Sequence, residues 1–316
     1  MHPELLIEFD SIINYSTAGL PQDLTVKWTY LSRVQIVNAF AEKGIIVSTY
    51  LVGQMLNLRG FKTRNVLKKN TLKQVEHRNE QFEKINQYRQ SFAEQGLPIL
   101  SIDTKKKEML GNFSRSGKAF ATGERTAFDH DFLSFADGQI VPHGIYDVLD
   151  NTAYITLGTS KDTSEFVCDN IQKCWLEHLQ FKYANATTML IICDGGGSNA
   201  SAHYIVKQDL LKLAKTLNIS ILVAHFPPHC SKWNPIEHRV FSQITHTWAG
   251  TPLLNLDFVK KMTDTTTTKT GLKVTTTINK KNYLTKRTVQ QDFKENLEQF
   301  IVFDDKLPKW NYFIKP

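Results

Sequence analysis

The chain has 316 residues, of which 41% are hydrophobic and 22% charged, and its formal net charge is +7. This length suits one large domain or two ordinary ones, and this composition excludes a wholly disordered protein. No apolar run reaches the ~18 residues that a membrane span needs. The start, MHPELLIEFDSI, is acidic where a signal peptide is basic, so we expect no export. The basic balance favours a polyanionic partner without proving one.

The four cysteines form neither a CxxC pair nor the spacing of a disulfide framework, which fits a reducing cytoplasm. They are Cys168, Cys174, Cys193 and Cys230.

Residues 27–64 predict two short helices around a turn at Gly44. In the first helix, apolar residues recur every three positions, and Ser48 is placed to cap the second helix. This layout is typical of a helix-turn-helix, whose second helix enters the DNA major groove. An ordinary helical hairpin explains the pattern equally well. The apolar stripe comprises Leu31, Val34, Val37 and Phe40, followed by Leu51, Met55 and Leu56.

The second of these helices would present three polar or aromatic side chains to DNA, namely Thr49, Tyr50 and Gln54. The chain as a whole is expected to have four parts. They are a helix-turn-helix region (1–70), a helical connector (71–97), a mixed α/β domain (98–262) and a Thr-rich C-terminal extension (263–316).

From residue 98 the pattern changes to short apolar strands. LPILSID is expected to be a strand with TKKKEMLGNF as its hairpin partner, and two more strands of antiparallel type follow. Helices and strands then alternate, and TTMLIICD, apolar on both faces, is typical of a sheet centre. A mixed sheet flanked by helices in this order is an α/β architecture of the ribonuclease-H-like class.

Three acids stand at matching places in this predicted sheet. Asp103 ends the first strand, Asp194 ends the central strand, and Glu237 lies in the first turn of the helix after the last strand. In a ribonuclease-H-like sheet these places converge at one edge. Because three neighbouring carboxylates repel one another, they need divalent cations to remain ionised together. Two Mg²⁺ ions about 4 Å apart would support an in-line phosphodiester displacement, and Mn²⁺ would substitute.

The stretch IICDGGGSN is therefore interpreted as a metal ligand, Asp194, followed by glycines that turn tightly beside incoming DNA. Ser198 or Asn199 is expected to cap the next helix. A nucleotide-binding phosphate loop is the weaker interpretation, because GxxxxGK[ST] does not occur. Three rival acids sit in a loop with no strand to hold them, namely Asp129, Asp131 and Asp137.

Several segments in order, SIDTKKKEMLGNF, VPHGIYDV, CDGGGSN, HFPPHCSKWNPIEHRVFS and TTTTKTGLKV, resemble the DDE transposases of the bacterial ISAzo-thirteen-like insertion-sequence family. NPIE is also similar to the motif of mariner-type transposases. The resemblance runs from about residue 27 to the closing WNYFIKP. It implies that Asp103, Asp194 and Glu237 form a catalytic triad that holds Mg²⁺.

The resemblance further implies an enzyme that cleaves the terminal inverted repeats of its own element and joins the 3′-hydroxyls to target DNA. Joining two ends implies at least a dimer on DNA, acting in the bacterial cytoplasm at the nucleoid. Two alternatives stay open: a metal-dependent nuclease without strand transfer, and a truncated or domesticated DNA-binding protein. The second arises because family members carry more chain ahead of the helix-turn-helix region.

Several basic and aromatic residues near the three acids are candidates for DNA contact, but each also has a purely structural explanation. The lysines after Asp103 and the residues flanking Glu237 would contact phosphate, and Trp233 would stack on an unpaired base. They also fit a solvated surface and, for Trp233, a core anchor. This set comprises Lys105, Lys106, Lys107, Lys232, Trp233 and Arg239.

The spacing H-x₃-H-C, formed by His225, His229 and Cys230, suggests zinc. No second cysteine pair stands at finger spacing, so a loop beside the acids is the favoured interpretation.

Overall fold

The structure is a computed structural model that describes residues 3–20, 23–64 and 75–316. It divides into two compact units, Met1–Thr71 and Leu72–Pro316. The predicted boundary between residues 70 and 71 lies outside the described residues.

The first unit contains the two helices predicted around Gly44, whose φ of +76° suits the turn between them. Ser48 caps the second helix, its Oγ accepting from the backbone N–H of Leu51 at 3.2 Å. The predicted apolar stripe is wrong at Val34, which is 58% exposed, because the 3.6-residue period turns Ile36 inward instead. The elements are α1 (Pro3–Asn14), β1 (Thr17–Leu20), β2 (Asp23–Thr29), α2 (Arg33–Glu42) and α3 (Thr49–Leu58).

The second unit is built on a nine-stranded mixed sheet, ordered β10-β11-β8-β7-β3-β5-β6-β9, with β4 paired to β5. β3, β5 and β6 are antiparallel neighbours, whereas β7 and β8 run parallel to β3. The strands are β3 (Ile99–Thr104), β4 (Glu108–Leu110), β5 (Gly138–Asp147), β6 (Thr152–Gly158), β7 (Thr188–Cys193), β8 (Ser220–His225), β9 (Lys273–Asn279), β10 (Ile301–Phe303) and β11 (Asn311–Ile314).

The order of the five inner strands, β8-β7-β3-β5-β6, confirms the predicted ribonuclease-H-like class. The prediction that residues 104–113 pair with the first strand is wrong. β4 pairs with β5 instead, because β3 already has β5 on one edge and β7 on the other.

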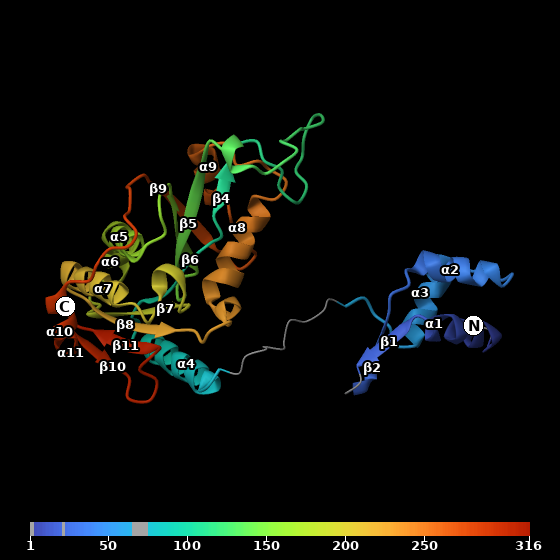
Figure 1. Cartoon of the computed structure of the whole chain (residues 1–316), viewed down its shortest axis with the longest axis horizontal. Helices are drawn as coiled ribbons and strands as arrows, with labels where there is room; N and C mark the ends of the chain where they lie inside the picture. Colours follow the sequence, from blue (N-terminus) through green and yellow to red (C-terminus); the bar gives the residue numbers. More distant parts are fainter. Residues whose placement is uncertain (1–2, 21–22, 65–74) are drawn as a thin grey trace. The chain divides into compact units, whose positions relative to one another are not determined.

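Helices cover both faces of this sheet (Figure 1). α5 and α7 pack one face through a large apolar cluster, whereas α4 and α8 cover the other face. The helical elements are α4 (Arg78–Glu94), η1 (Leu133–Phe135), α5 (Ser164–Cys174), η2 (Trp175–Leu179), α6 (Gln180–Lys182), η3 (Gly197–Asn199), α7 (Tyr204–Leu217), η4 (Ser231–Trp233), η5 (Glu237–Phe241), α8 (Ser242–Thr247), α9 (Leu256–Asp264), α10 (Gln291–Glu295) and α11 (Leu297–Phe300). In the described part of the chain, none is long and apolar enough to cross a membrane.

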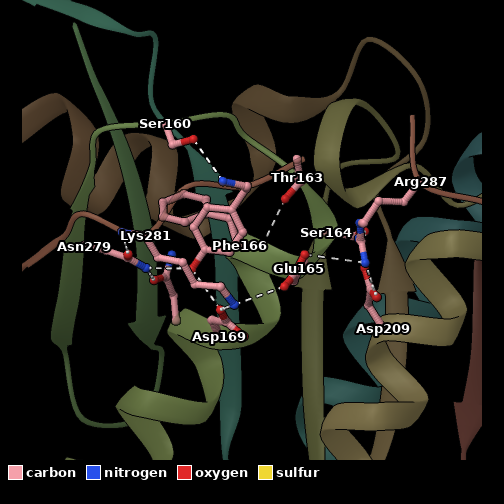
Figure 2. Close-up of polar contacts among 12 residues, drawn as sticks. Ser160, Thr163, Ser164, Glu165, Phe166, Asp169, Asp209, Asn279, Lys281 and Arg287 are labelled. Carbon is pink, nitrogen blue, oxygen red and sulfur yellow. Dashed lines mark hydrogen bonds and ion pairs between the residues drawn. The ribbon is translucent and has the colours of Figure 1, made fainter. Parts of the chain in front are cut away.

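The Thr-rich C-terminal extension completes the sheet at both edges. β9 adds to β6 in parallel, and β11 adds to β8 in an antiparallel pair. The chain between them crosses the face covered by α5 and α7, where it is held by a polar network (Figure 2). Lys281 forms ion pairs with Glu165 and Asp169, and Arg287 Nη1 donates to Asp209 Oδ1 at 3.0 Å.

We expect the Arg287→Ala variant to lose up to about 3 kcal/mol of unfolding free energy, because Asp209 would stay buried without its cation. Lys281→Ala is the matched control, since Lys281 is half-exposed and its loss should cost less than about 1 kcal/mol. Urea unfolding followed by circular dichroism measures both. Equal losses would show that the Asp209 pair is no stronger than a surface pair.

Candidate active site

Asp103 and Asp194 lie at the carboxyl ends of two neighbouring parallel strands, β3 and immediately after β7. Ser101 pairs with Ile192, so two further residues along each strand bring Asp103 level with Asp194. Because side chains alternate along a strand, Asp103 faces the same side of the sheet as Ser101. The segment that contacts Ser101 therefore lies on the same side of the sheet as the Asp103 carboxyl group.

Ser101 is bonded to the segment that carries Glu237. Its Oγ donates to Asn234 Oδ1 at 2.5 Å and accepts from the Ile236 backbone N–H at 3.0 Å. Asn234 Nδ2 in turn donates to the Ile102 carbonyl at 2.9 Å. Ser101 and Asn234 are both fully buried, so water does not compete for these bonds. We call this arrangement the Asn234 clamp, and it fixes the start of η5 against β3.

Gly144 permits the close approach of η5 to the sheet. Gly144 lies on β5, directly opposite Asp103 of β3. A Cβ atom at Gly144 would lie 2.6 Å from Ile236 Cδ1 and 2.8 Å from Phe241 Cε1. Any larger residue would push this helix away from the sheet, and Glu237 with it. Glu237 itself opens a π-helical turn, a wide turn found often at functional sites.

The three carboxyl groups share one electrostatic environment. Burial first, and then the charges of Asp194 and Glu237, raise the pKa of Asp103 to about 8. Burial also raises the pKa of Glu237, while a hydrogen bond with Asp103 opposes that shift. The pKa of Asp194 is raised by burial and by the charge of Asp162. The site thus carries more negative charge than its surroundings compensate.

This donor set fits a divalent cation by its chemistry, because hard carboxylate oxygens are what Mg²⁺ and Mn²⁺ prefer. A cation would stabilise the charged carboxylates against the burial and repulsion that raise these pKa values. Within residues 3–20, 23–64 and 75–316, however, no group of three or more His, Cys, Asp or Glu side chains is already arranged around a metal position.

Sequence analysis did not single out Asp162, the acid that follows β6. Thr104 Oγ1 donates to Asp162 Oδ1 at 3.2 Å, and the Ser198 side chain also bonds to this carboxyl. Asp162 thereby connects the tip of β3 to the glycine loop after Asp194. No motif marks it, because the contact depends on where β6 ends relative to β3.

The prediction that Ser198 or Asn199 caps the next helix is wrong. Both residues are buried in the short turn η3, and α7 begins at Tyr204 with His203 as its N-cap. Ser198 uses its side chain on Asp162 instead, which leaves the loop between Asp194 and α7 longer than expected.

His225 holds the backbone of Asp194 through a hydrogen bond. Its Nδ1 donates to the Asp194 carbonyl at 2.9 Å, and the Tyr312 hydroxyl donates to its Nε2 at 3.1 Å. Burial lowers the pKa of His225 to about 4, so the ring is neutral at pH 7. Of the other residues in the H-x₃-H-C spacing, Cys230 accepts a bond from Arg78 Nε at 3.3 Å, and His229 has a φ of +63° in a turn.

The three lysines predicted to contact phosphate near Asp103 differ in exposure and in their partners. Lys105 pairs with Glu108 at 2.7 Å and stands over the Trp248 ring, so its charge is largely committed within the fold. Lys106 and Lys107 are exposed. The charge of Lys107 lowers the pKa of Asp162, which places it near the site.

The residues flanking Glu237 reach the surface. Trp233 is 53% exposed and packs edge-on against Phe82, their ring centroids 6.3 Å apart. Lys232 stands over the Trp233 ring, and Arg239 is exposed. The predicted DNA contacts on α3 are also exposed, namely Thr49, Tyr50 and Gln54.

The three rival acids, Asp129, Asp131 and Asp137, are exposed in the loop between β4 and β5.

Comparison with known proteins gives one family match. The family described as the Rhodopirellula transposase DDE domain matches residues 8–316. No curated protein matches the chain. Solved structures that match include a pre-cleavage Mos1 transpososome (12% identity, TM-score 0.44) and the mariner Mos1 paired-end complex with Mg (16% identity, TM-score 0.45). Each match covers 81% of this chain, and 69% and 68% of the Mos1 chains respectively.

The raised pKa of Asp103 predicts how stability depends on pH without metal. The folded state keeps this proton up to a pH of about 8, whereas the unfolded chain loses it near 3.8. Its stabilising contribution is therefore lost as the pH rises between these values. We expect Mg²⁺ to raise the Tm more at pH 8 than at pH 6, and scanning fluorimetry in EDTA or Mg²⁺ measures this.

The control for that measurement is Asp103→Asn, which keeps the size of the side chain and removes its titration. This variant should lose the Mg²⁺ effect and the part of the pH trend that Asp103 causes. An identical pH and Mg²⁺ response in both proteins would contradict the assignment.

The Asn234 clamp predicts a loss of stability in Asn234→Asp. The substitution replaces the Nδ2 donor with an oxygen that faces the Ile102 carbonyl, which should cost about 1–3 kcal/mol. Asn112→Asp is the matched control, because Asn112 donates to the Thr126 carbonyl at an exposed position. It should cost less than about 0.5 kcal/mol. Chemical denaturation compares the two, and similar losses would count against the clamp.

Proposed function

The chain belongs to the Rhodopirellula transposase DDE family, and on this premise we propose that it cuts the ends of its own mobile element and joins them to target DNA. The observation that supports this proposal is the placement of Asp103, Asp194 and Glu237 at one sheet edge, through the strand register and the Asn234 clamp. The reaction would hydrolyse phosphodiester bonds and transfer the freed 3′-hydroxyls.

In this proposal Asp103, Asp194 and Glu237 hold Mg²⁺, for which Mn²⁺ substitutes. The metal, when bound, supplies activation of the attacking hydroxyl and stabilisation of the departing oxygen. The protein contributes orientation: the Asn234 clamp sets Glu237, and His225 holds the Asp194 backbone. Such positioning accounts for a large share of the rate in phosphoryl transfer.

The surrounding cations and aromatics are proposed to hold DNA. Lys106, Lys107 and Arg239 would neutralise backbone phosphates, and the exposed ring of Trp233 would stack on an unpaired base. Lys232 lies beside that ring. Lys105, engaged with Glu108, would act on the site through its charge alone.

The helices α2 and α3 are proposed to act as a helix-turn-helix that recognises the terminal inverted repeats. Their second helix presents Thr49, Tyr50 and Gln54 to the exterior while Val52 and Met55 are buried. Since two element ends must be joined, we propose that at least two copies assemble on DNA. The reaction would take place in the bacterial cytoplasm, at the nucleoid.

The test uses the DNA that flanks this gene, placed on a supercoiled plasmid with protein and Mg²⁺ or Mn²⁺. Mapping of 3′ ends and joined products should show cuts at the repeat ends followed by strand transfer. Asp194→Asn should reduce both by about 10³-fold, since several kcal/mol of metal-dependent stabilisation is lost. Asp305→Asn, at an exposed position, is the matched control and should retain activity.

Two other outcomes would replace the proposal. Scattered nicks without joined products would indicate a metal-dependent nuclease. Retained DNA binding with no cuts in the wild-type protein would indicate a DNA-binding protein that no longer cleaves.

A further inference from the structure

Lys207 is the only lysine or arginine that is buried in the described part of the chain, with 6% of its surface exposed. It forms no ion pair with a described carboxylate, and burial lowers its pKa. Lys207 is the fourth residue of α7, whose first turn contains no acid, so the helix dipole also disfavours its charge. Because this position costs stability, the amine is better explained by what it holds than by the space it fills.

The amine of Lys207 holds the loop that follows Asp194. This glycine loop comprises residues 195–203 and connects Asp194 to α7. Lys207 Nζ donates to the Ser201 carbonyl. The Ser201 hydroxyl lies next to Gly195, since a Cβ atom at Gly195 would be 3.7 Å from Ser201 Oγ. Lys207 is therefore linked through Ser201 to the residue directly after Asp194.

The middle of the glycine loop has an anchor of its own, the bond between Ser198 and Asp162. The three glycines before it are exposed. Beyond its chain neighbours, a Cβ atom at Gly196 would approach a single atom of the described residues within 4 Å, Asp194 Oδ2 at 3.7 Å. Packing therefore does little to fix this stretch, so its conformation depends on the anchors at Ser198 and Ser201.

Contacts that begin at Lys207 reach both the carboxyl group and the backbone of Asp194. The glycine loop bonds to the carboxyl group, because the Gly196 N–H donates to Asp194 Oδ1 at 3.4 Å. On the other side, Lys207 Nζ stands 5.0 Å from the centroid of the Tyr312 ring. The Tyr312 hydroxyl bonds to His225, which holds the Asp194 carbonyl. Lys207 thus lies behind Asp194, where the two sets of contacts meet.

We propose that Lys207 is a positioning residue for Asp194, which anchors the glycine loop at Ser201 and so fixes the Asp194 carboxyl group for a divalent cation. The proposal deepens the proposed function and rests on it for the metal. Lys207 itself touches neither metal nor DNA in this role. Removing a contact of this kind behind a metal ligand typically weakens metal binding by about 10- to 100-fold.

The first test compares Lys207→Met with the wild type, using full-length protein without DNA. Methionine keeps an unbranched apolar side chain and removes the amine that bonds to Ser201. We expect hydrogen–deuterium exchange to become faster in peptides from the glycine loop and to stay unchanged in the strands of the sheet. The Tm should equal or exceed that of the wild type, because a buried charge near a helix N-terminus has been removed.

The second test measures Mn²⁺ binding to both proteins by electron paramagnetic resonance of the free ion. We expect the Kd of Lys207→Met to rise by about tenfold. The direction of the change is decisive, because removing a positive charge near a cation site should by itself strengthen Mn²⁺ binding. Weaker binding therefore reports lost positioning rather than lost charge.

Lys212→Met is the matched control, since it makes the same change at an exposed position of the same helix. Its loop exchange and its Mn²⁺ affinity should equal those of the wild type. If Lys207→Met does not fold, Lys207→Gln carries the test, because its shorter side chain also loses the bond to Ser201.

Unchanged loop exchange in Lys207→Met would overturn the anchor, and an unchanged or lower Kd for Mn²⁺ would overturn the positioning of Asp194. A lower Tm with faster exchange throughout the second unit would make Lys207 a general core residue and would overturn both. Failure of the proposed function is separable. Wild-type protein that binds Mn²⁺ without cutting DNA rejects only the transposase activity, whereas wild-type protein that binds no Mn²⁺ rejects the metal site and this positioning role together.

Discussion

The candidate site depends on one buried polar contact, the Asn234 clamp. Glu237 is distant in sequence from Asp103. The bonds from Asn234 and Ile236 to Ser101 and Ile102 fix the start of its helix on β3, and apolar packing against β5 and β6 holds the rest of the helix. Because all of these groups are shielded from water, breaking one bond leaves an unpaired polar atom in the interior. The clamp is therefore both a fold constraint and the device that sets the spacing of the acids.

Charge is distributed unequally over the face that carries these acids. Burial raises the pKa values of Asp103, Asp194 and Glu237, and the negative charges of neighbouring carboxyl groups add to each rise. In the proposed function, a divalent cation would neutralise part of this negative charge. In that proposal, the protein without metal gives up stability at this face for the capacity to bind the cation.

The fold class could be predicted, and Asp103, Asp194 and Glu237 could be proposed as a site, because both depend on features that lie close together in the chain. Strand ends, a glycine turn and the cap at Ser48 are features of a few adjacent residues. The helix start at Tyr204 could not be predicted, since Ser198 bonds to Asp162 across the sheet edge rather than to its own helix. Asp162 and the role of His225 were missed for the same reason: their partners are set by packing, which no short sequence pattern records.

The C-terminal extension contributes three strands, β9, β10 and β11, to the same sheet that carries Asp103 and Asp194. β11 covers the edge of β8 and places Tyr312 against His225, whose ring holds the Asp194 carbonyl. A chain of contacts thus runs from the last strand to Asp194, one of the three proposed metal ligands, and burial keeps its histidine neutral. Since an open sheet edge also invites aggregation, the extension serves stability and positioning at once. A shortened protein would lose both together.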